Sequence, residues 1–428
     1  MDVRIEEFEP IEVEKNIPEL DLLNSTLLNE GEKGFLHNFY RFMEEELLED
    51  IKQFEELNYK VEEPIENKKK RLVIAFLKKL SDHGYYSTIL NQEDFNIGRI
   101  TRNVLIGLSL SGGFWSERTE RYIPGNYSLE MGRLAGGTLY CNPVNYKANQ
   151  FQREKFLFPV AKDGAPAASA MTEFNAGSDI FRLECKIDDS EDVARITGKK
   201  LFITNGVLAD YIVLYGRRNS GDLGAIVFET NHQNLENFES SRVRMFGMDD
   251  AFVSRLIFNG TEFPKENILE GNGLDIMFHQ LTEERLVISA EALGDTIRKM
   301  YLTHAFAKRR EQFKKRLHQY QCIRFPIAED IRELNILLYS LLSHARDLDA
   351  HPELGSSKMM AQNAMGLKVK ATEISFQSTM NAYRTLGGRA FTKQFSNQMG
   401  LLDSFCMLHG GGSNYVLGDA ESRRTFKS

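Results

Sequence analysis

The spacing of apolar residues changes character twice along the chain, from a helical period to short strand-like runs and back. Between residues 31 and 164 most apolar positions recur with the period of a helix. In NKKKRLVIAFLKKLSDHGYY, for example, Leu72, Phe76 and Leu80 fall on one face, and His-Gly ends the pattern. From 165 to 272 the apolar runs are short and separated by Gly, Asn and Asp, as in ARITGKKLFITNG, DYIVLYGR, GAIVFET and SRLIFNGTEFP. Each run predicts a strand, and together they predict an antiparallel β domain.

Helical spacing returns from residue 273 to 428 and predicts three long helices. The first has an apolar face made of Leu286, Ala290, Leu293, Ile297, Met300 and His304, and the second a face made of Ile327, Ile331, Leu334, Leu338, Leu341 and Ala345. We expect Pro326 to lie in the first turn of the second helix, where proline is tolerated, and the third helix to end at Gly387-Gly388. Long helices with so few glycines are typical of an antiparallel bundle.

The predicted organisation is therefore an acidic, weakly periodic N-terminal arm (residues 1–30), a helical domain (31–164), a β domain (165–272) and a helical bundle (273–428). At 428 residues, with 42% hydrophobic and 27% charged residues, the chain has the composition of a globular protein with several domains. Its net charge of −8 argues against a nucleic-acid-binding protein. We interpret the lysines at 68–70 as a solvated helix face.

Cysteine usage and terminal sequence indicate the compartment. The four cysteines are far apart, which argues against a metal site or a disulfide framework and favours a reducing environment: Cys141, Cys185, Cys322 and Cys406. The N-terminal residues lack the basic and apolar pattern of a signal peptide. Apolar runs end well short of the roughly twenty residues needed to cross a bilayer. We therefore expect a cytoplasmic protein without a membrane span.

Two stretches in the β domain have a composition that suits a planar or anionic ligand. In MTEFNAGSD, small and hydroxyl-bearing residues such as Thr172, Gly177 and Ser178 lie close together, so backbone N–H groups could approach a ligand. In KKLFITNG, Phe202 and Thr204 stand at strand spacing on one face and could flank a ring system. A surface turn and ordinary core packing explain the same residues taken singly.

The combination is more specific. Five motifs follow one another along the chain in this order: AMTEFNAGSD, GKKLFITNG…ADYIVLYGR, GM…FNGTEFPKENIL, KRREQF…QYQCIRFPIAEDI and LGGRAFT. With these motifs the chain resembles, over roughly residues 95–420, the acyl-CoA dehydrogenase family of flavoproteins. The resemblance implies an α+β fold with an N-terminal α-helical domain, a central antiparallel β domain and a C-terminal four-helix bundle. It implies FAD as cofactor and an oxidoreductase acting on CH–CH bonds of acyl thioesters. The family usually has Pro-Gly where Phe174-Asn175 stands here.

The resemblance also assigns residues to FAD: Met171, Thr172, Ser178, Phe202, Ile203, Thr204, Arg310, Gln321, Arg384, Gly387, Gly388, Ser413 and Asn414. Met171 and Thr172 would contact the flavin ring. Arg310 would reach the pyrophosphate of FAD bound to a neighbouring subunit, a role that suits a permanently charged donor fork. That contact implies a homo-oligomer, a dimer or a tetramer. Without the resemblance, the basic cluster would be interpreted as a solvated helix end: Lys308, Arg309, Arg310, Lys314, Lys315 and Arg316.

The residue that removes the α proton in the common family pattern is a glutamate in a C-terminal Tyr-Glu-Gly-Thr segment, and this chain has HGGGSN there. Gly411, or Gly410 with a one-residue gap, stands at the base position, and neither can accept a proton. His409 is adjacent and is one alternative base, although its spacing does not match. In LTEERLVISA, Glu284 matches the position at which the isovaleryl and long-chain branches of the family place their base.

We therefore expect Glu284 to be catalytic and Ser178, Thr282, Arg285 and Gly411 to bind substrate. The competing interpretation is that TEER forms an acidic first helical turn capped by Thr282, and we expect Glu283 to have that structural role.

Three functions remain open from the sequence. The first is an FAD-dependent acyl thioester dehydrogenase, in which a base takes the α proton as the β hydride passes to flavin N5. Its acyl group would be carried on CoA or on an acyl-carrier protein, and the resemblance implies an electron-transferring flavoprotein as acceptor. The second is a flavin-dependent monooxygenase on the same fold, with His409 assisting oxygen chemistry. The third is a non-catalytic relative.

Overall fold

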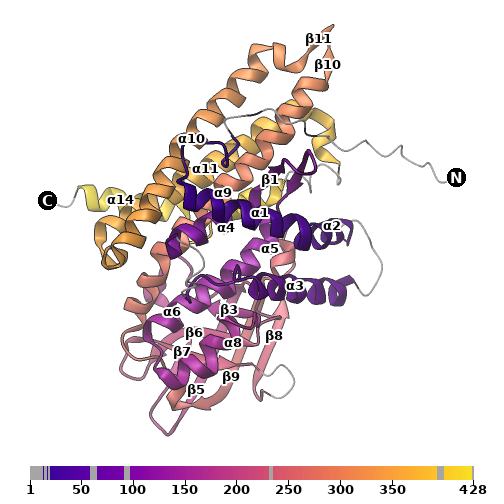
Figure 1. Cartoon of the computed structure of the whole chain (residues 1–428). Helices are drawn as coiled ribbons and strands as arrows, with labels where there is room; N and C mark the ends of the chain where they lie inside the picture. Colours follow the sequence, from indigo (N-terminus) through magenta and orange to yellow (C-terminus); the bar gives the residue numbers. More distant parts are fainter. Residues whose placement is uncertain are drawn as a thin grey trace.

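The computed structural model describes residues 13, 17, 20–57, 65–90, 97–230, 235–392 and 400–426 (Figure 1). Most of the predicted N-terminal arm lies outside these residues. In the part of it that is described, Leu20, Leu22, Leu27 and Leu28 are buried in the main hydrophobic core. The division into an arm and three domains at residues 30, 164 and 272 stays a prediction.

The N-terminal half is built of helices: α1 (Glu30–Phe42), α2 (Leu48–Leu57), α3 (Ile65–Asp82), α4 (Arg99–Gly112), α5 (Tyr127–Arg133), α6 (Cys141–Lys147), α7 (Gln150–Gln152) and α8 (Phe158–Ala161). Asn29 caps α1 in a reciprocal capping box with Glu32. π-Helical segments at Met43–Leu47, Leu134–Tyr140 and Arg153–Leu157 join neighbouring α-helices. Helical periodicity did not predict the short hairpin of β1 (Gly113–Ser116) and β2 (Arg121–Pro124) that follows α4.

The central region is a curled seven-stranded sheet made of β3 (Ala167–Ala170), β4 (Lys186–Asp188), β5 (Val193–Ile203), β6 (Tyr211–Arg218), β7 (Leu223–Glu229), β8 (Phe238–Arg242) and β9 (Ser254–Pro264). The four runs interpreted as strands correspond to β5, β6, β7 and β9. Most pairings are antiparallel, but β3 and β4 each pair with β6 in parallel. A separate apolar core lies within the curl of the sheet and includes Ile196, Phe228 and Phe258.

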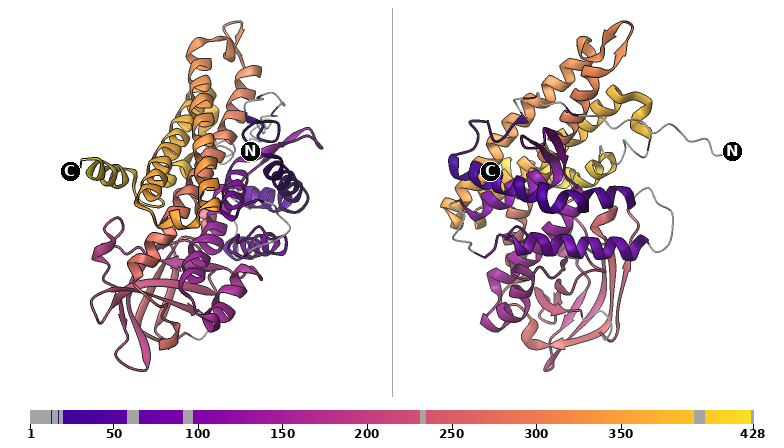
Figure 2. Two further views of the ribbon diagram at one scale, coloured as in Figure 1. Left: turned by 60° about the vertical axis from the view of Figure 1, so that its left-hand side comes forward. Right: turned by 45° about the vertical axis from the view of Figure 1, so that its right-hand side comes forward.

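The C-terminal region consists of α9 (Gly273–Arg309), α10 (Gln321–Ala350) and α11 (Lys358–Leu386), followed by the short helices α13 (Leu401–Met407) and α14 (Asn414–Thr425). Between α9 and α10 lies a small hairpin of β10 (Glu311–Gln312) and β11 (Lys315–Arg316). Figure 2 shows the bundle and the sheet at opposite ends of the molecule, with the N-terminal helices alongside. α9 packs against α11 and also against α4, so it is the central helix of the fold.

Three local expectations are wrong. α9 begins at Gly273 with Asn272 as its cap, so Thr282 and Glu283 lie in the helix interior and not in a first turn. α10 begins at Gln321, which places Pro326 inside that helix beyond its first turn. Lys69 is buried and its Nζ donates to Asp250 Oδ1 at 2.6 Å, so the lysines at 68–70 are not uniformly solvated.

Candidate active site

Glu284 lies in the first third of α9, a helix that packs against both the sheet and the bundle. Its side chain is buried, and burial raises the pKa of its carboxyl to about 7, while the positive charges of Arg285 and Lys368 oppose that rise. One helical turn earlier, Gln280 Oε1 accepts a hydrogen bond of 2.8 Å from the hydroxyl of Tyr215 on β6. This contact ties the helix to the sheet next to Glu284. A buried carboxyl with a pKa near neutrality is suited to proton transfer.

The glycine-rich turn at 410–412 lies directly against Glu284. A β carbon placed on Gly411 would be 3.9 Å from Glu284 Oε1 and 3.0 Å from Ile288 Cδ1. Gly411 has a φ of +64°, a conformation that glycine adopts without strain. Arg285 Nε donates to the Gly411 carbonyl at 3.1 Å and holds the turn against α9. The carboxyl of Glu284 and the peptide at Gly411 are therefore neighbours, although they are far apart in sequence.

A lysine from α11 holds the same turn from the other side. Lys368 Nζ donates to the carbonyls of Leu408 and Gly412 at 3.2 and 2.9 Å and to Asn414 Oδ1 at 2.8 Å. Its side chain is buried, and burial lowers the pKa of Lys368 to about 8, against the opposing effect of the negative charge on Glu284. The turn is thus fixed by two cations, Arg285 and Lys368, that also act electrostatically on Glu284.

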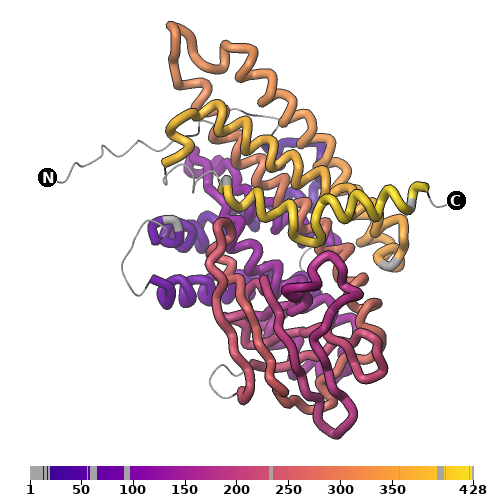
Figure 3. The backbone as a smooth tube through the Cα atoms, turned by 180° about the vertical axis from the view of Figure 1, so that it is seen from behind, coloured from indigo at the N-terminus to yellow at the C-terminus, as the bar shows by residue number. Residues whose placement is uncertain are grey.

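The other C-terminal candidates are placed less favourably for catalysis. The His409 side chain is exposed. Ser413 precedes α14 as its cap residue. The Asn414 amide is bonded within the bundle, because its Nδ2 donates to Thr372 Oγ1 at 3.0 Å and to Glu373 Oε1 at 2.9 Å. Figure 3 shows the C-terminal segment running along the bundle above the sheet.

Thr282 does not belong to this constellation. At about 100° per residue, it lies roughly 200° around α9 from Glu284 and so faces away from it. Glu283, the other residue of the expected cap, is held by the guanidinium of Arg99 at 2.8 and 2.9 Å and by the amides of Asn103 and Asn142 at 2.8 and 2.6 Å. Burial alone would raise the pKa of Glu283, but Arg99 and Asn103 outweigh it and hold that pKa below its usual range. Glu283 is thus part of a satisfied structural network between α9 and the N-terminal helices.

The loop after β3 is anchored from beneath by a buried lysine. Lys200 Nζ donates to the Met171 carbonyl and to Glu173 Oε1, both at 2.7 Å. Glu173 also accepts from the backbone N–H groups of Glu184 and Cys185 at 2.7 and 3.0 Å. These contacts fix the loop while Ser178 remains exposed and Thr172 half-buried.

β5 presents an aromatic side chain beside this loop. Leu201 N donates to the Thr172 carbonyl at 3.0 Å. Phe202 follows at a bulge in the pairing of β5 with β9; its φ is +61° and its side chain is 55% exposed. The bulge corrects the expectation of regular strand spacing between Phe202 and Thr204. The Ile203 side chain is buried in the core of the sheet, which leaves only its backbone for a ligand.

The remaining FAD candidates gather at the far end of the bundle. Arg310 and Gln321 flank the β10–β11 hairpin at the tip of α9 and α10 (Figure 1), and both side chains are exposed. Gly387 and Gly388, which follow α11, are brought to the same end by a small apolar cluster of Leu302, Phe306, Ala382, Leu386 and Ala390, against which Leu317 packs. Arg384 is exposed near the end of α11. The structure thus gathers these candidates as two groups, one at the loop after β3 and the end of β5 and one at the bundle tip, while Ser413 and Asn414 lie at the turn next to Glu284.

The chemistry of the two groups fits FAD. Near the sheet there are an exposed aromatic face at Phe202, hydroxyls at Thr172, Ser178 and Thr204, and bare backbone at Gly177, whose nearest neighbouring atom is 3.8 Å from a β carbon placed there. At the bundle tip, β carbons on Gly387 and Gly388 would meet no atom of the described residues within 4 Å, and the exposed Arg310 guanidinium could donate to phosphate.

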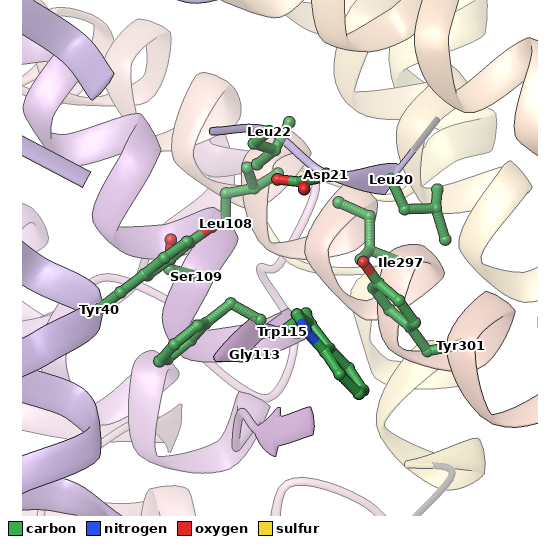
Figure 4. Close-up of a pocket in the computed structure, with 11 residues that line it drawn as sticks. Leu20, Asp21, Leu22, Tyr40, Leu108, Ser109, Gly113, Trp115, Ile297 and Tyr301 are labelled. Atoms are coloured by element: carbon green, nitrogen blue, oxygen red, sulfur yellow. The ribbon is translucent and has the colours of Figure 1, made fainter. Parts of the chain in front are cut away.

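The cavity drawn in Figure 4 lies elsewhere. It measures about 20 Å³, which suits about one water molecule, and is lined by the N-terminal segment, α1, α4, β1 and α9 through residues such as Leu20, Tyr40, Ser109, Trp115 and Tyr301. None of the predicted site residues lines it. Among the described residues, no helix is long and apolar enough to cross a membrane, and no group of three or more potential metal ligands is found.

Known proteins resemble this chain in sequence. The family profile "Acyl-CoA dehydrogenase, C-terminal domain" matches residues 271–425, the region that contains Glu284 and Gly411. This part of the chain thus matches the C-terminal domain of the acyl-CoA dehydrogenase family. The chain is 26% identical over 307 residues to the mitochondrial isovaleryl-CoA dehydrogenase of Arabidopsis thaliana, covering 71% of this chain and 73% of that protein. It is also 26% identical over 282 residues to L-prolyl-[peptidyl-carrier protein] dehydrogenase of a Serratia species, covering 64% and 70%.

Solved structures show the same fold. A glutaryl-CoA dehydrogenase from Mycobacterium smegmatis in complex with FADH2 aligns with a TM-score of 0.81 at 17% identity, over 96% of this chain and 98% of that one. The butyryl-CoA dehydrogenase from Megasphaera elsdenii aligns with a TM-score of 0.77 at 20% identity, over 94% and 99%. The expected α+β architecture of helices, central sheet and helical bundle is thereby confirmed.

Sequence reasoning missed two residues that shape the site. Lys368 falls on the apolar face of α11 with Ala364 and Ala371, and a lysine at such a position is a signal for a buried partner. Asn205 has a φ of +62° and its Nδ2 donates to the carbonyls of Gly132 and Ala167 at 2.8 and 3.2 Å. It fixes the end of β5, and hence Phe202, against α5.

Proposed function

We propose that this protein is an FAD-dependent acyl thioester dehydrogenase in which Glu284 removes the α proton. The observation that carries the proposal is the buried Glu284 carboxyl beside the Gly411 turn, because the turn stands where the family's usual base is absent. FAD, when bound, supplies the acceptor for the β hydride. Glu284 at its pKa of about 7 is partly ionised at neutral pH and can take the α proton.

The neighbouring cations support this role. Arg285 and Lys368 both lower the pKa of Glu284 from the value that burial alone would produce, so a reactive fraction of carboxylate persists at neutral pH. Both donate to the turn at 408–414, and thereby hold this turn in place beside Glu284. The exposed His409 has no comparable support as a base. Because Glu284 is buried, water is kept away from the carboxyl that would hold the α proton.

The cofactor would be shared between two copies of the chain. We propose that Met171, Thr172, Ser178, Phe202, Thr204 and Ser413 of one copy, with the backbone of Ile203, hold one part of FAD, while Arg310, Gln321, Arg384, Gly387 and Gly388 of another copy hold the rest. The protein would then be a homo-oligomer. Arg310→Ala is expected to lower the FAD content of the purified protein, whereas Lys315→Ala on the same hairpin is the matched control. Equal FAD content in both variants would contradict the shared site.

The substrate class follows from the family and the site. The relatives named above act on acyl groups carried by CoA or by a carrier protein, and we propose one of these two carriers here, with an electron-transferring flavoprotein as the acceptor. A cytoplasmic location stays a prediction.

The proposed function is tested by anaerobic titration of the FAD-loaded protein with saturated acyl-CoA thioesters of different lengths. We expect at least one thioester to abolish the oxidised-flavin absorbance and to yield its α,β-unsaturated product. Flavin that stays oxidised with every thioester, but is reduced by NAD(P)H, would contradict the proposal and favour the monooxygenase.

A further inference from the structure

A second glutamate on α9 has no role in the mechanism above. Glu291 is completely buried, and with both Glu291 and Glu130 ionised neither of the Glu291 carboxyl oxygens has a hydrogen-bond donor among the described residues. It follows Glu284 by seven residues, which is about two turns, so the two side chains share a face of the helix and their α carbons are about 10 Å apart. Ile288 lies between them on the same face and contacts the Gly411 turn. Glu291 therefore lies about two turns further along the same face of α9 that carries Glu284 and Ile288.

The groups that face Glu291 do not neutralise it fully. Glu130 of α5 is held by Arg133, whose Nε and Nη2 donate to its two oxygens at 2.6 and 2.5 Å. Arg133 Nη1 donates elsewhere, to Asn103 Oδ1 at 2.9 Å. Glu130 and Arg133 are both buried and oppose each other in charge, so Glu291 is the surplus acid of the group.

The three elements around Glu291 approach each other closely. A β carbon placed on Gly107 of α4 would lie 3.2 Å from Glu130 Oε1 and 3.7 Å from Glu291 Cγ. Tyr127, also buried on α5, has its pKa raised by burial, and among the nearby acids the negative charge of Glu291 contributes most to that rise. Burial, and then the negative charge of Glu130, raise the pKa of Glu291 well above its usual range; Arg133 lowers it, and a hydrogen bond with the Glu130 carboxyl and the charge of Glu284 add smaller increases. A carboxyl in this position is expected to keep its proton unless a cation replaces it.

We propose that Glu291, with Glu130 beside it, forms the inner end of the acyl subsite and binds a hydrogen-bond donor, an ammonium group foremost, on the acyl part of the substrate. The inference rests on the proposed function, because it takes Glu284 to mark the position of the α carbon. A hydrocarbon tail that ended against Glu291 would leave this buried carboxyl facing the acid Glu130 and without a donor of its own, which is unfavourable. An ammonium group would donate hydrogen bonds to the Glu291 carboxylate and balance the surplus charge.

The test uses the FAD-loaded protein and thioesters in matched pairs, in which an ammonium group replaces a terminal methyl group. The pairs are β-alanyl-CoA with butyryl-CoA, 6-aminohexanoyl-CoA with heptanoyl-CoA, and 8-aminooctanoyl-CoA with nonanoyl-CoA. We expect kcat/KM for flavin reduction to be at least tenfold higher for the amino member of at least one pair. Glu291→Gln keeps the shape of the side chain but removes the charge, and it should abolish most of that preference. Glu239→Gln on the exposed edge strand β8 is the matched control and should preserve it.

The methyl member reacting as fast as the amino member in every pair would overturn the inference while leaving the proposed function intact. An amino preference that survives Glu291→Gln unchanged would also overturn the assignment to Glu291. If no thioester of any pair reduces the flavin, the proposed function itself fails. Should Glu291→Gln not fold, the comparison within pairs on the wild-type protein still decides whether the subsite prefers a cation.

Discussion

Lys368 offers a sharp test of how the site sets the reactivity of Glu284. Lys368→Met removes a positive charge that lowers the pKa of Glu284, together with three hydrogen bonds to the turn at 408–414. The pKa of Glu284, about 7 in the intact protein, should therefore rise. Because the base must be ionised to take the α proton, the rate of flavin reduction at neutral pH should fall and should recover at higher pH.

The size of the effect follows from the interaction of two unit charges. At separations of several ångströms and an effective dielectric constant of about 20, such a pair interacts by roughly 2–3 kcal/mol, which corresponds to a pKa shift of about one to two units. At pH 7 a rise of one unit lowers the ionised fraction of Glu284, and hence the rate, severalfold; a rise of two units lowers it by more than tenfold. The lost hydrogen bonds to Leu408 and Gly412 should reduce the limiting rate at high pH as well, because the turn around Gly411 is then held less firmly against Glu284.

The assay is stopped-flow flavin reduction by a saturating thioester across a range of pH. Lys370→Met is the matched control, since Lys370 is exposed on the same helix. Lys368→Arg should keep the apparent pKa near that of the wild type, because the positive charge remains. A Lys368→Met profile that coincides with those of Lys370→Met and the wild type would refute the electrostatic link between Lys368 and Glu284.

Three further predictions concern stability and the position of the base. The carboxyl of Glu284 has a pKa of about 7 in the folded protein against an ordinary 4.5, so folding stability is lost as pH rises between these values. At pH 8, Glu284→Gln should therefore raise the free energy of unfolding by up to about 3 kcal/mol, and with it the thermal midpoint measured by scanning fluorimetry. At pH 4 the midpoint should be unchanged. The double variant Glu284→Gly/Gly411→Glu should regain at least part of the flavin reduction that is lost in Glu284→Gly. Backbone strain at φ +64° and the contact with Ile288 should limit this recovery. No recovery in a correctly folded, FAD-loaded protein would argue that residues 284 and 411 cannot present a carboxylate to the same place. Lys200→Met leaves Glu173 buried without its cation and should lower the free energy of unfolding by about 3–5 kcal/mol in urea titrations, and a loss below about 1 kcal/mol would count against that anchor.

Much of the fold could be predicted because its periodic signals are strong. The strands β5, β6, β7 and β9 have turn residues at their ends, and α9, α10 and α11 have apolar faces several turns long. The β1–β2 hairpin was missed because its strands are only four residues each and lie between helices. The interpretation of TEER as a first helical turn was wrong because a threonine followed by two acids is also typical of a helix N-terminus, whereas Asn272 ten residues earlier is the residue that caps α9.

The site was predictable only as far as the motifs extend. Glu284 was found through its position in LTEERLVISA, but its proximity to Gly411 depends on how α9, α11 and the C-terminal turn pack together. Lys368 was missed although it stands on the apolar face of α11, and Glu291 was overlooked because a charged residue within a helix usually faces solvent. Their burial is a property of tertiary packing, in which each helix covers the polar groups of the next.

The measurement that bears most directly on the central claim is the pH dependence of anaerobic flavin reduction in the wild type and in Glu284→Gln, with a thioester that reduces the wild-type flavin. The account predicts that the wild-type rate rises through an apparent pKa of about 7. In Glu284→Gln it predicts a rate at least 100-fold lower, without that ionisation, since a positioned general base typically contributes about 10²–10⁴-fold. Flavin reduction by Glu284→Gln at the wild-type rate, with the same pH profile, would show that another residue is the base.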